Sequence, residues 1–336
     1  MRKLKVIQVG LTHDHSSGMM EGLQRCLDMF DIVGYVDDRE LITTACCNVR
    51  GFHLYENLPQ LTLEEALNYP DLDAVFVEVT NGDLVRIAQM FADRKIPIHM
   101  DKPAGTDLAA YKKLLDTCEK YDLPFQMGYM FRGNMAMQLC LKAQREGWLG
   151  EVFEIQADMN HNYGSQVFEE YLASYPGGLM FNLACHFIDL FVKMLGEPQR
   201  VIPFLKTVPG WQPCNQNNCT AILEYPQALA TFKATSHAID GQKHRRLKII
   251  GTKGAIELCP VEIFKTPWQM EMILAEGNDE YPAGKNIVEF PPVADRYEDH
   301  IRHFGNMLLG NIKNEYTYHH DYLVHRATLQ ACGLDV

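Results

Sequence analysis

Positive charge is scarce in this sequence, because 31 Lys and Arg stand against 43 Asp and Glu, a net charge of −12. Such an acidic chain is a poor partner for polyanions, so we expect neither nucleic acid nor a membrane surface as its target. Long apolar runs are also missing, since none approaches the ~18 residues of a membrane helix. The basic start MRKLK is followed only by VIQVGL before polar residues, too short for a signal-peptide core. We therefore expect a cytoplasmic protein.

Cysteine is sparse too, with 10 residues in 336. This is too few for a disulfide scaffold of this length. No two cysteines form a CxxC pair, although Cys46 and Cys47 are adjacent, so a structural zinc site of that kind is unsupported. We expect reduced and mostly buried thiols.

The length of 336 residues suggests roughly two domains. In the first part, short β-branched runs at 5–10, 32–36, 74–79, 96–100 and 124–128 alternate with segments of helical spacing, such as 16–30 and 107–121. Thr62 and Glu65 fit a capping box that opens a short helix. Strand–helix alternation predicts a parallel sheet with crossover helices, a doubly wound Rossmann-type domain over residues 1–128.

The pattern changes after about residue 150. Strand-like runs at 152–159, 221–225, 229–234, 247–251 and 255–258 are interrupted by two clear helices near 180–195 and 296–309. This predicts an α+β domain over residues 129–336 with a large, mostly antiparallel, open-faced sheet.

The first strand ends in a candidate dinucleotide loop, Gly10-Leu11-Thr12-His13-Asp14-His15. Of the G-x-G-x-x-G fingerprint only Gly10 is present, and Thr12 and His15 replace the other glycines. The next strand ends in Asp37-Asp38, and an acidic residue there binds an adenosine ribose and favours NAD over NADP. Arg39 leaves NADP open, because an arginine at this edge can bind the 2′-phosphate.

His13-x-His15 also admits a metal interpretation, as in amidohydrolase barrels. Such a barrel needs eight strand–helix units, and only five precede the change of pattern. Because the sequence places no further ligands around the two imidazoles, we expect no metal.

Two further segments can carry chemistry. The fourth strand runs into Asp101-Lys102-Pro103, where a parallel sheet opens toward its ligand. On the helix near 180–195, Asn182, His186 and Asp189 form a polar stripe beside an apolar one. An imidazole among apolar neighbours is a candidate proton donor or acceptor.

With these segments the sequence resembles the glucose–fructose oxidoreductase / inositol dehydrogenase (Gfo/Idh/MocA) family over nearly its whole length. Asp101-Lys102-Pro103 stands at the family's Glu-Lys-Pro motif, and Gly177-Gly178 through His186-x-x-Asp189 matches its signature helix. Further matches lie at 77–81, 130–132, 147–152 and 251–254.

The resemblance implies a nicotinamide dinucleotide and a sugar or polyol substrate. It implies Lys102 as the catalytic lysine, His186 as the acid/base residue, and Thr80 and Asn81 at the cofactor. Asn182 stands where many members carry an Asp, and an amide cannot raise the basicity of His186 as a carboxylate would. The full set of expected site residues follows: catalytic Lys102, His186 and Asn182; cofactor-binding Gly10, Leu11, Thr12, His13, Asp37, Asp38, Thr80, Asn81, Asp101, Lys102 and Pro103; substrate-binding Arg132, Asn160, His161, Tyr163 and Asp189.

The leading hypothesis is an NAD-dependent dehydrogenase, with NADP possible, acting on a CH–OH group. Three alternatives stay open: a cofactor-retaining sugar lyase or hydrolase that works by transient oxidation, a dinucleotide-binding protein without catalysis, and a metal-dependent hydrolase. An open-faced sheet tends to bury its free face, so we expect a homodimer or homotetramer.

Overall fold

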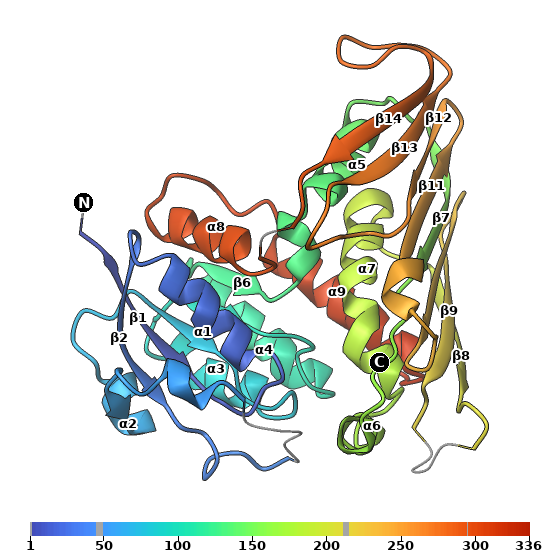
Figure 1. The fold of residues 1–336 in the computed structure, drawn as a ribbon. Helices are drawn as coiled ribbons and strands as arrows, with labels where there is room; N and C mark the ends of the chain where they lie inside the picture. Colours follow the sequence, from blue (N-terminus) through green and yellow to red (C-terminus); the bar gives the residue numbers. More distant parts are fainter. Residues whose placement is uncertain (1, 45–49, 211–214, 294) are drawn as a thin grey trace. The chain divides into compact units, whose positions relative to one another are not determined.

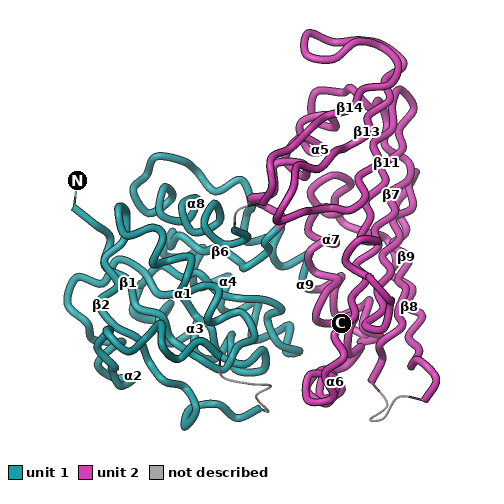
Figure 2. Tube along the Cα trace, in the orientation of Figure 1, with its two compact units in different colours: residues 1–130, 295–325 teal, residues 131–294, 326–336 magenta. Residues whose placement is uncertain are grey.

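The computed structural model describes residues 2–44, 50–210, 215–293 and 295–336. These residues form two compact units, shown in Figure 2. Unit 1 comprises Met1–Met130 and Asp295–His325, and unit 2 comprises Phe131–Ala294 and Arg326–Val336. The adjacent Cys46 and Cys47 lie outside the described residues.

Unit 1 carries, within the described ranges, a six-stranded sheet whose strands are all parallel and whose order is β3-β2-β1-β4-β5-β6. This is the strand order of dinucleotide-binding Rossmann folds, and it confirms the predicted doubly wound sheet. An open sheet of this kind is not the closed eight-unit barrel that the metal-dependent hydrolase alternative required. The strands are β1 (Leu4–Val9), β2 (Phe30–Val36), β3 (Gln60–Leu61), β4 (Ala74–Val77), β5 (Ile98–Met100) and β6 (Phe125–Met127).

Helices cover this sheet because its strands are apolar on both faces; all four residues of β4 are fully buried. The predicted capping box is confirmed at α2, where Thr62 and Glu65 each accept from the other's backbone N–H. The helices of unit 1 are α1 (Ser16–Arg25), α2 (Leu63–Leu67), α3 (Leu84–Ala92), α4 (Leu108–Lys120), α8 (Glu298–Leu308) and the first part of α9 (Tyr318–Ala331). The 3-10 turn η1 (Phe52–Leu54) lies within unit 1, and η2 (Met130–Gly133) begins at its last residue before unit 2.

The helix α8 belongs to unit 1 although it lies far along the chain. Ile301, Phe304 and Met307 join the hydrophobic core that contains Phe30 and Phe76, and Figure 1 shows α8 beside α1. The two compact units therefore have different bounds from the two domains expected from the sequence. Residues 295–325 belong to unit 1, whereas the sequence analysis placed all of 129–336 in the second domain. As domains, 1–128 and 129–336 stay a prediction.

Unit 2 carries, in its described part, an eight-stranded sheet of order β14-β13-β12-β11-β7-β10-β9-β8. All neighbouring pairs are antiparallel except β7 with β10, which confirms the predicted mostly antiparallel sheet. The strands are β7 (Val152–Asp158), β8 (Arg200–Lys206), β9 (Asn218–Glu224), β10 (Leu229–Thr235), β11 (Arg246–Gly251), β12 (Gly254–Leu258), β13 (Trp268–Leu274) and β14 (Gly284–Phe290).

One face of this sheet is covered by α7 (Leu179–Leu195), which lies against β10 and β9 (Figure 1). Ala230, Phe232 and Ala234 of β10 are buried on that face. The unit also contains α5 (Met135–Arg145), α6 (Gln166–Ala173) and the 3-10 turn η3 (Gly241–His244). Across the part of the chain that the structure describes, no helix has both the length and the apolar character to cross a bilayer.

Candidate functional site

The loop after β1 lies directly against the end of β4. Gly10 has φ +113°, and a Cβ there would stand 2.4 Å from the carbonyl carbon of Glu78. The backbone N–H of His13 donates to the Glu78 carbonyl at 3.1 Å. Gly10 is therefore required both by its left-handed φ and by the close approach of two backbones.

The missing fingerprint glycines are replaced by side-chain contacts. Asp38 is fully buried; its carboxylate accepts from the backbone N–H of Leu11 at 2.8 Å and from the hydroxyl of Thr12. The neighbouring Asp37 instead binds the guanidinium of Arg39, with Nε 3.0 Å from each carboxylate oxygen. Of the predicted pair, Asp38 holds the loop, and Asp37 is the carboxylate left at the outer edge of β2.

The helix α1 begins at Ser16, immediately after this loop, and its first turn contains no acidic residue. Its N-terminus therefore offers N–H groups and a positive dipole end to an anion. Together with the close approach at Gly10, this fits a dinucleotide pyrophosphate. Thr12 and His15 change the side chains of the loop but keep the strand–loop–helix geometry.

A second polar group forms around Asp83 at the start of α3. Its buried carboxylate accepts from the backbone N–H of Thr43 at 2.8 Å, from the hydroxyls of Thr43, Thr44 and Thr80 at 2.9 to 3.1 Å, and from Arg86 at 2.8 Å. The hydroxyls of Thr44 and Thr80 lie 2.7 Å apart. Thr80, predicted at the cofactor, is thus fixed by a carboxylate that sequence analysis did not single out.

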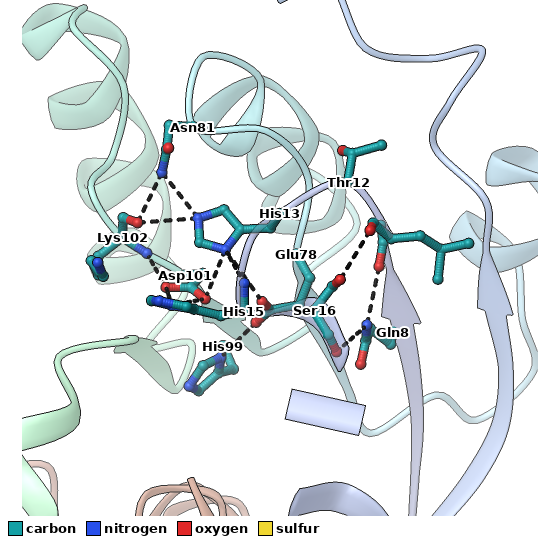
Figure 3. A network of polar contacts seen from close by, with 12 residues as sticks. Gln8, Thr12, His13, His15, Ser16, Glu78, Asn81, His99, Asp101 and Lys102 are labelled. Atoms are coloured by element: carbon teal, nitrogen blue, oxygen red, sulfur yellow. Dashed lines mark hydrogen bonds and ion pairs between the residues drawn. The ribbon is translucent and has the colours of Figure 1, made fainter. Parts of the chain in front are cut away.

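The segment Asp101-Lys102-Pro103 follows β5 and is buried throughout (Figure 3). The backbone N–H of Lys102 donates to Asp101 Oδ1 at 2.6 Å, and Asn81 Nδ2 donates to the Lys102 carbonyl at 2.8 Å. His13 Nε2 lies 3.2 Å from the same carbonyl. The structure therefore brings the predicted residues Thr12, His13, Asn81, Asp101 and Lys102 together at the carboxyl ends of β1, β4 and β5.

Buried carboxyl groups and imidazoles lie close together below this segment, and they shift one another's pKa values. Burial alone would raise the pKa of Asp101, but the imidazoles of His13 and His15 hold it well below its usual range. Burial, and then the Asp101 charge, raise the pKa of Glu78 well above its usual range. Burial lowers the pKa of His99 to about 4. Glu78 and His99 were not predicted as site residues, although each is an ionisable residue within an otherwise apolar run of sequence.

In unit 2 the predicted acid/base residue His186 lies on α7 and is 2% exposed. Its ring lies 5.6 Å from that of Phe131, centroid to centroid. Asn182, one turn earlier, is half-buried. The carboxylate of Asp189, nearly one turn after His186, is held by Arg132, with Nε and Nη2 at 3.0 and 2.7 Å. The predicted substrate residues Arg132 and Asp189 thus form a buried bidentate pair.

The remaining predicted substrate residues lie just after β7. The ring of His161 stacks on Tyr163 at 4.3 Å and contacts Arg245 Nη2 at 2.8 Å. Arg245 also donates to Glu262 at 2.9 Å and to the carbonyl of Asn160 at 3.3 Å. Arg245 and Glu262, both buried, were not predicted, because nothing in the sequence links residues so far apart.

Comparisons with known proteins identify the class. Residues 7–129 match the family described as "Oxidoreductase family, NAD-binding Rossmann fold", so unit 1 carries an NAD-binding Rossmann fold. Residues 137–257 match the GFO/IDH/MocA C-terminal domain. The chain therefore belongs to the GFO/IDH/MocA oxidoreductase family, as its sequence predicted.

Among curated proteins the chain is similar to a D-apiose dehydrogenase from Rhizobium rhizogenes, 24% identical over 202 residues. The match covers 54% of this chain and 59% of that relative. An oxidoreductase from Agrobacterium radiobacter, solved with NAD+, L-tartaric acid and magnesium, has a TM-score of 0.78 at 16% identity, covering 99% of this chain and 97% of its own. An oxidoreductase from Thermotoga maritima has a TM-score of 0.77 at 16% identity, covering 98% of this chain and 96% of its own. Both structures share the fold.

Proposed function

We propose that the protein is an NAD-dependent dehydrogenase that transfers a hydride between the nicotinamide and a hydroxyl-bearing carbon of a sugar or polyol. The observation that carries this proposal is the buried Lys102 at the carboxyl end of β5, tied through Asn81 and His13 to the loop after β1. The similar D-apiose dehydrogenase supports a sugar as the substrate class.

The residues that would hold the cofactor are Gly10 to His13 with the N-terminus of α1 at the pyrophosphate, Asp37 at the ribose, and Thr80, Asn81, Asp101 and Pro103 around the nicotinamide half. When bound, NAD supplies the hydride acceptor. Asp38 would not contact the cofactor directly. Its carboxylate accepts hydrogen bonds from Leu11 and Thr12 and so stabilises the loop that binds the cofactor. Arg39 leaves NADP open as a second cofactor.

We assign the two chemical roles of the reaction to Lys102 and His186. The Lys102 ammonium would donate a hydrogen bond to the reacting oxygen and stabilise its developing negative charge. The His186 imidazole would accept the hydroxyl proton as the alcohol is oxidised and return it in reduction. Asn182, one turn before His186, would contact it without adding charge.

Specificity is proposed to come from residues of unit 2. Arg245 holds the Asn160 carbonyl and the His161 ring, and Tyr163 stacks on that ring. These three residues would contact substrate hydroxyls. Because Arg132 and Asp189 satisfy each other, we propose that this pair positions the surrounding elements as well as bordering the substrate.

The first experiment is a titration of the purified protein with NAD, NADH, NADP and NADPH, after denatured supernatant has been checked for bound cofactor. Saturable NAD binding, followed by NADH formation with D-apiose, other aldoses or cyclic polyols, is the expected result. Cofactor that co-purifies and does not exchange would favour the masked-redox enzyme. Absence of binding by all four dinucleotides would overturn the proposal.

Lys102→Ala is expected to lower kcat by about 10²- to 10⁴-fold while NAD binding stays within a few fold. The matched control is Lys112→Ala, which removes an exposed lysine of α4 that pairs with Asp116. Steady-state turnover and NAD titration measure the two effects. Wild-type turnover by the Lys102 variant would refute its role.

We also propose a homodimer or homotetramer, located in the cytoplasm. The strand register places Phe204, Leu229, Ile273 and Ile287 on the sheet face opposite α7, each 45 to 51% exposed. Exposed apolar side chains on one sheet face favour a second copy as the partner. Light scattering that gives a monomer mass would contradict this proposal.

A further inference from the structure

A cluster of nitrogen and oxygen atoms lies beneath the loop after β1. His13 Nδ1 and His15 Nδ1 lie 3.1 and 3.0 Å from the same atom, Asp101 Oδ2. Figure 3 shows the two imidazoles and the carboxylate turned toward one another, from the loop and from the end of β5. One ligand atom from each of the three residues lies within 4.8 Å of the others.

Each ring nitrogen of His13 meets one donor and one acceptor. At Nε2 the ring meets the Asn81 amide nitrogen, a donor, at 3.0 Å and the Lys102 carbonyl, an acceptor, at 3.2 Å. At Nδ1 it meets the backbone N–H of His15, a donor, at 3.1 Å and the Asp101 carboxylate, an acceptor, at 3.1 Å. With the proton on Nδ1, the ring donates to Asp101 and accepts from Asn81; with the proton on Nε2, it donates to the Lys102 carbonyl and turns the Nδ1 lone pair toward Asp101. The second tautomer is the one that can bind a cation held between Nδ1 and Asp101.

A second, independent observation is the carboxyl group of Glu78, which points to the same place. Glu78 is 0% exposed, neither of its oxygens accepts a hydrogen bond from a donor group among the described residues, and its carboxyl group hydrogen-bonds with that of Asp101. Its Oε2 lies 3.9 Å from His13 Nδ1. Two buried carboxyl groups in contact repel each other unless they share a proton or a cation, and a bound cation would let both carry their charge.

Metal–ligand bonds of about 2.0 to 2.2 Å place neighbouring ligand atoms about 2.8 to 3.1 Å apart at right angles and about 3.3 to 3.6 Å apart in a tetrahedron, a total range of about 2.8 to 3.6 Å. The two imidazole–carboxylate distances, 3.1 and 3.0 Å, fall in this range. The Glu78 Oε2 atom, 3.9 Å from His13 Nδ1, lies just outside it. The Nε2 contact of His13 with a backbone carbonyl is the outer interaction that metal-bound imidazoles make.

We propose that His13, His15 and Asp101, with Glu78 as a fourth ligand, bind one divalent transition-metal ion. Two imidazoles and two carboxylates suit Zn²⁺, Fe²⁺ or Co²⁺. The ion fixes the loop after β1 to the end of β5, where the fingerprint glycines are missing. The sequence indicated no metal because it could not show that β4 and β5 bring Glu78 and Asp101 to the two histidines.

The test uses the untagged full chain, stripped with a chelator and reconstituted with Zn²⁺ or Co²⁺. We expect about one metal ion per chain by elemental analysis, visible ligand-field bands with Co²⁺, and a higher melting temperature with Zn²⁺. The double variant His13→Ala/His15→Ala is expected to lose at least 90% of the bound metal. The control His53→Ala/His244→Ala removes two exposed histidines and is expected to bind metal like the wild type.

Glu78→Gln keeps the side-chain volume, so it serves if the double variant does not fold. It is expected to weaken Zn²⁺ binding at least about tenfold in a competition titration. Substoichiometric metal in the reconstituted wild type, or unchanged affinity in both variants, would overturn the proposal. Metal content is measured without turnover or NAD, so this outcome is distinct from failure of the proposed function.

Discussion

At the scale of single residues, the neighbours Asp37 and Asp38 show how one acidic dipeptide serves two purposes. Both follow β2, and the sequence presents them as equivalent candidates for the ribose. The structure separates them, because Asp38 turns inward to Leu11 and Thr12 while Asp37 pairs with Arg39 at the edge. Only contact with a loop 26 residues earlier distinguishes the two side chains.

This difference predicts that substitution of Asp38 mainly lowers stability, whereas substitution of Asp37 mainly weakens cofactor binding. Asp38→Ala leaves the Leu11 N–H unsatisfied, and we expect it to lower the free energy of unfolding by about 3 kcal/mol. Asp37→Ala is expected to change stability by less than about 0.5 kcal/mol, while weakening NAD binding relative to NADP. Urea denaturation and dinucleotide titration of the two variants measure both effects. Equal loss of stability in the two would contradict the assignment.

At the scale of elements, most of the first sheet was predictable because its strands are short apolar runs between clear helices. The predicted runs 5–10 and 74–79 became Leu4–Val9 and Ala74–Val77. In unit 2, β8, β13 and β14 were not predicted. In β13 the buried residues are Trp268, Met270, Met272 and Leu274, and methionines in alternation are a weak strand signal.

The site was predictable to a different degree. Motif residues such as Lys102 and Asn81 lie together because strand ends of a parallel sheet share one edge. The partners that hold them could not be predicted. Glu78 and Asp83 contact residues of other strands and loops, and these contacts cannot be read from the sequence around them. Arg245 contacts His161, which lies 84 residues earlier in the chain.

The helix α9 carries a buried titratable group, His325, whose ring packs on Tyr111 of α4 at 4.9 Å. Burial lowers the pKa of His325 to about 4 from its usual 6.5. Because the unfolded chain takes up this proton first, the stabilising contribution is complete above pH 6.5 and is lost as the pH falls toward 4.

His325→Phe keeps an aromatic contact with Tyr111 and removes the titration. Between pH 7 and 5 the free energy of unfolding of the wild type is expected to fall by about 2 kcal/mol more than that of the variant. Urea unfolding at pH 5, 6 and 7 measures the difference. The exposed His319→Phe is the control and is expected to follow the wild type. Parallel pH dependence in His325→Phe and wild type would show that the histidine is not buried as a neutral group.

At the scale of the whole molecule, unit 1 is not a continuous stretch of chain. Ile301, Phe304 and Met307 complete its core from residues that follow unit 2 in sequence. Removing three such side chains at about 3 kcal/mol each amounts to about 9 kcal/mol, comparable with the whole stability of a domain.

The fragment 1–130 is therefore expected not to fold cooperatively by itself. It should bind a hydrophobic dye and exchange its amide protons rapidly. Joining residues 295–325 to it through a flexible linker is expected to restore a cooperative melting transition. Cooperative melting of the shorter fragment would show that α8 is dispensable.

This discontinuity also has a consequence for biosynthesis. A ribosome that makes about 5 to 20 residues per second finishes the six strands of the first sheet long before it reaches Phe304. For roughly 10 to 30 seconds at that rate, α8 has not yet been synthesised. During this time the apolar side chains around Phe30 and Phe76 stay exposed to solvent or to a chaperone. The nascent protein is therefore most vulnerable to aggregation while its second half is being translated.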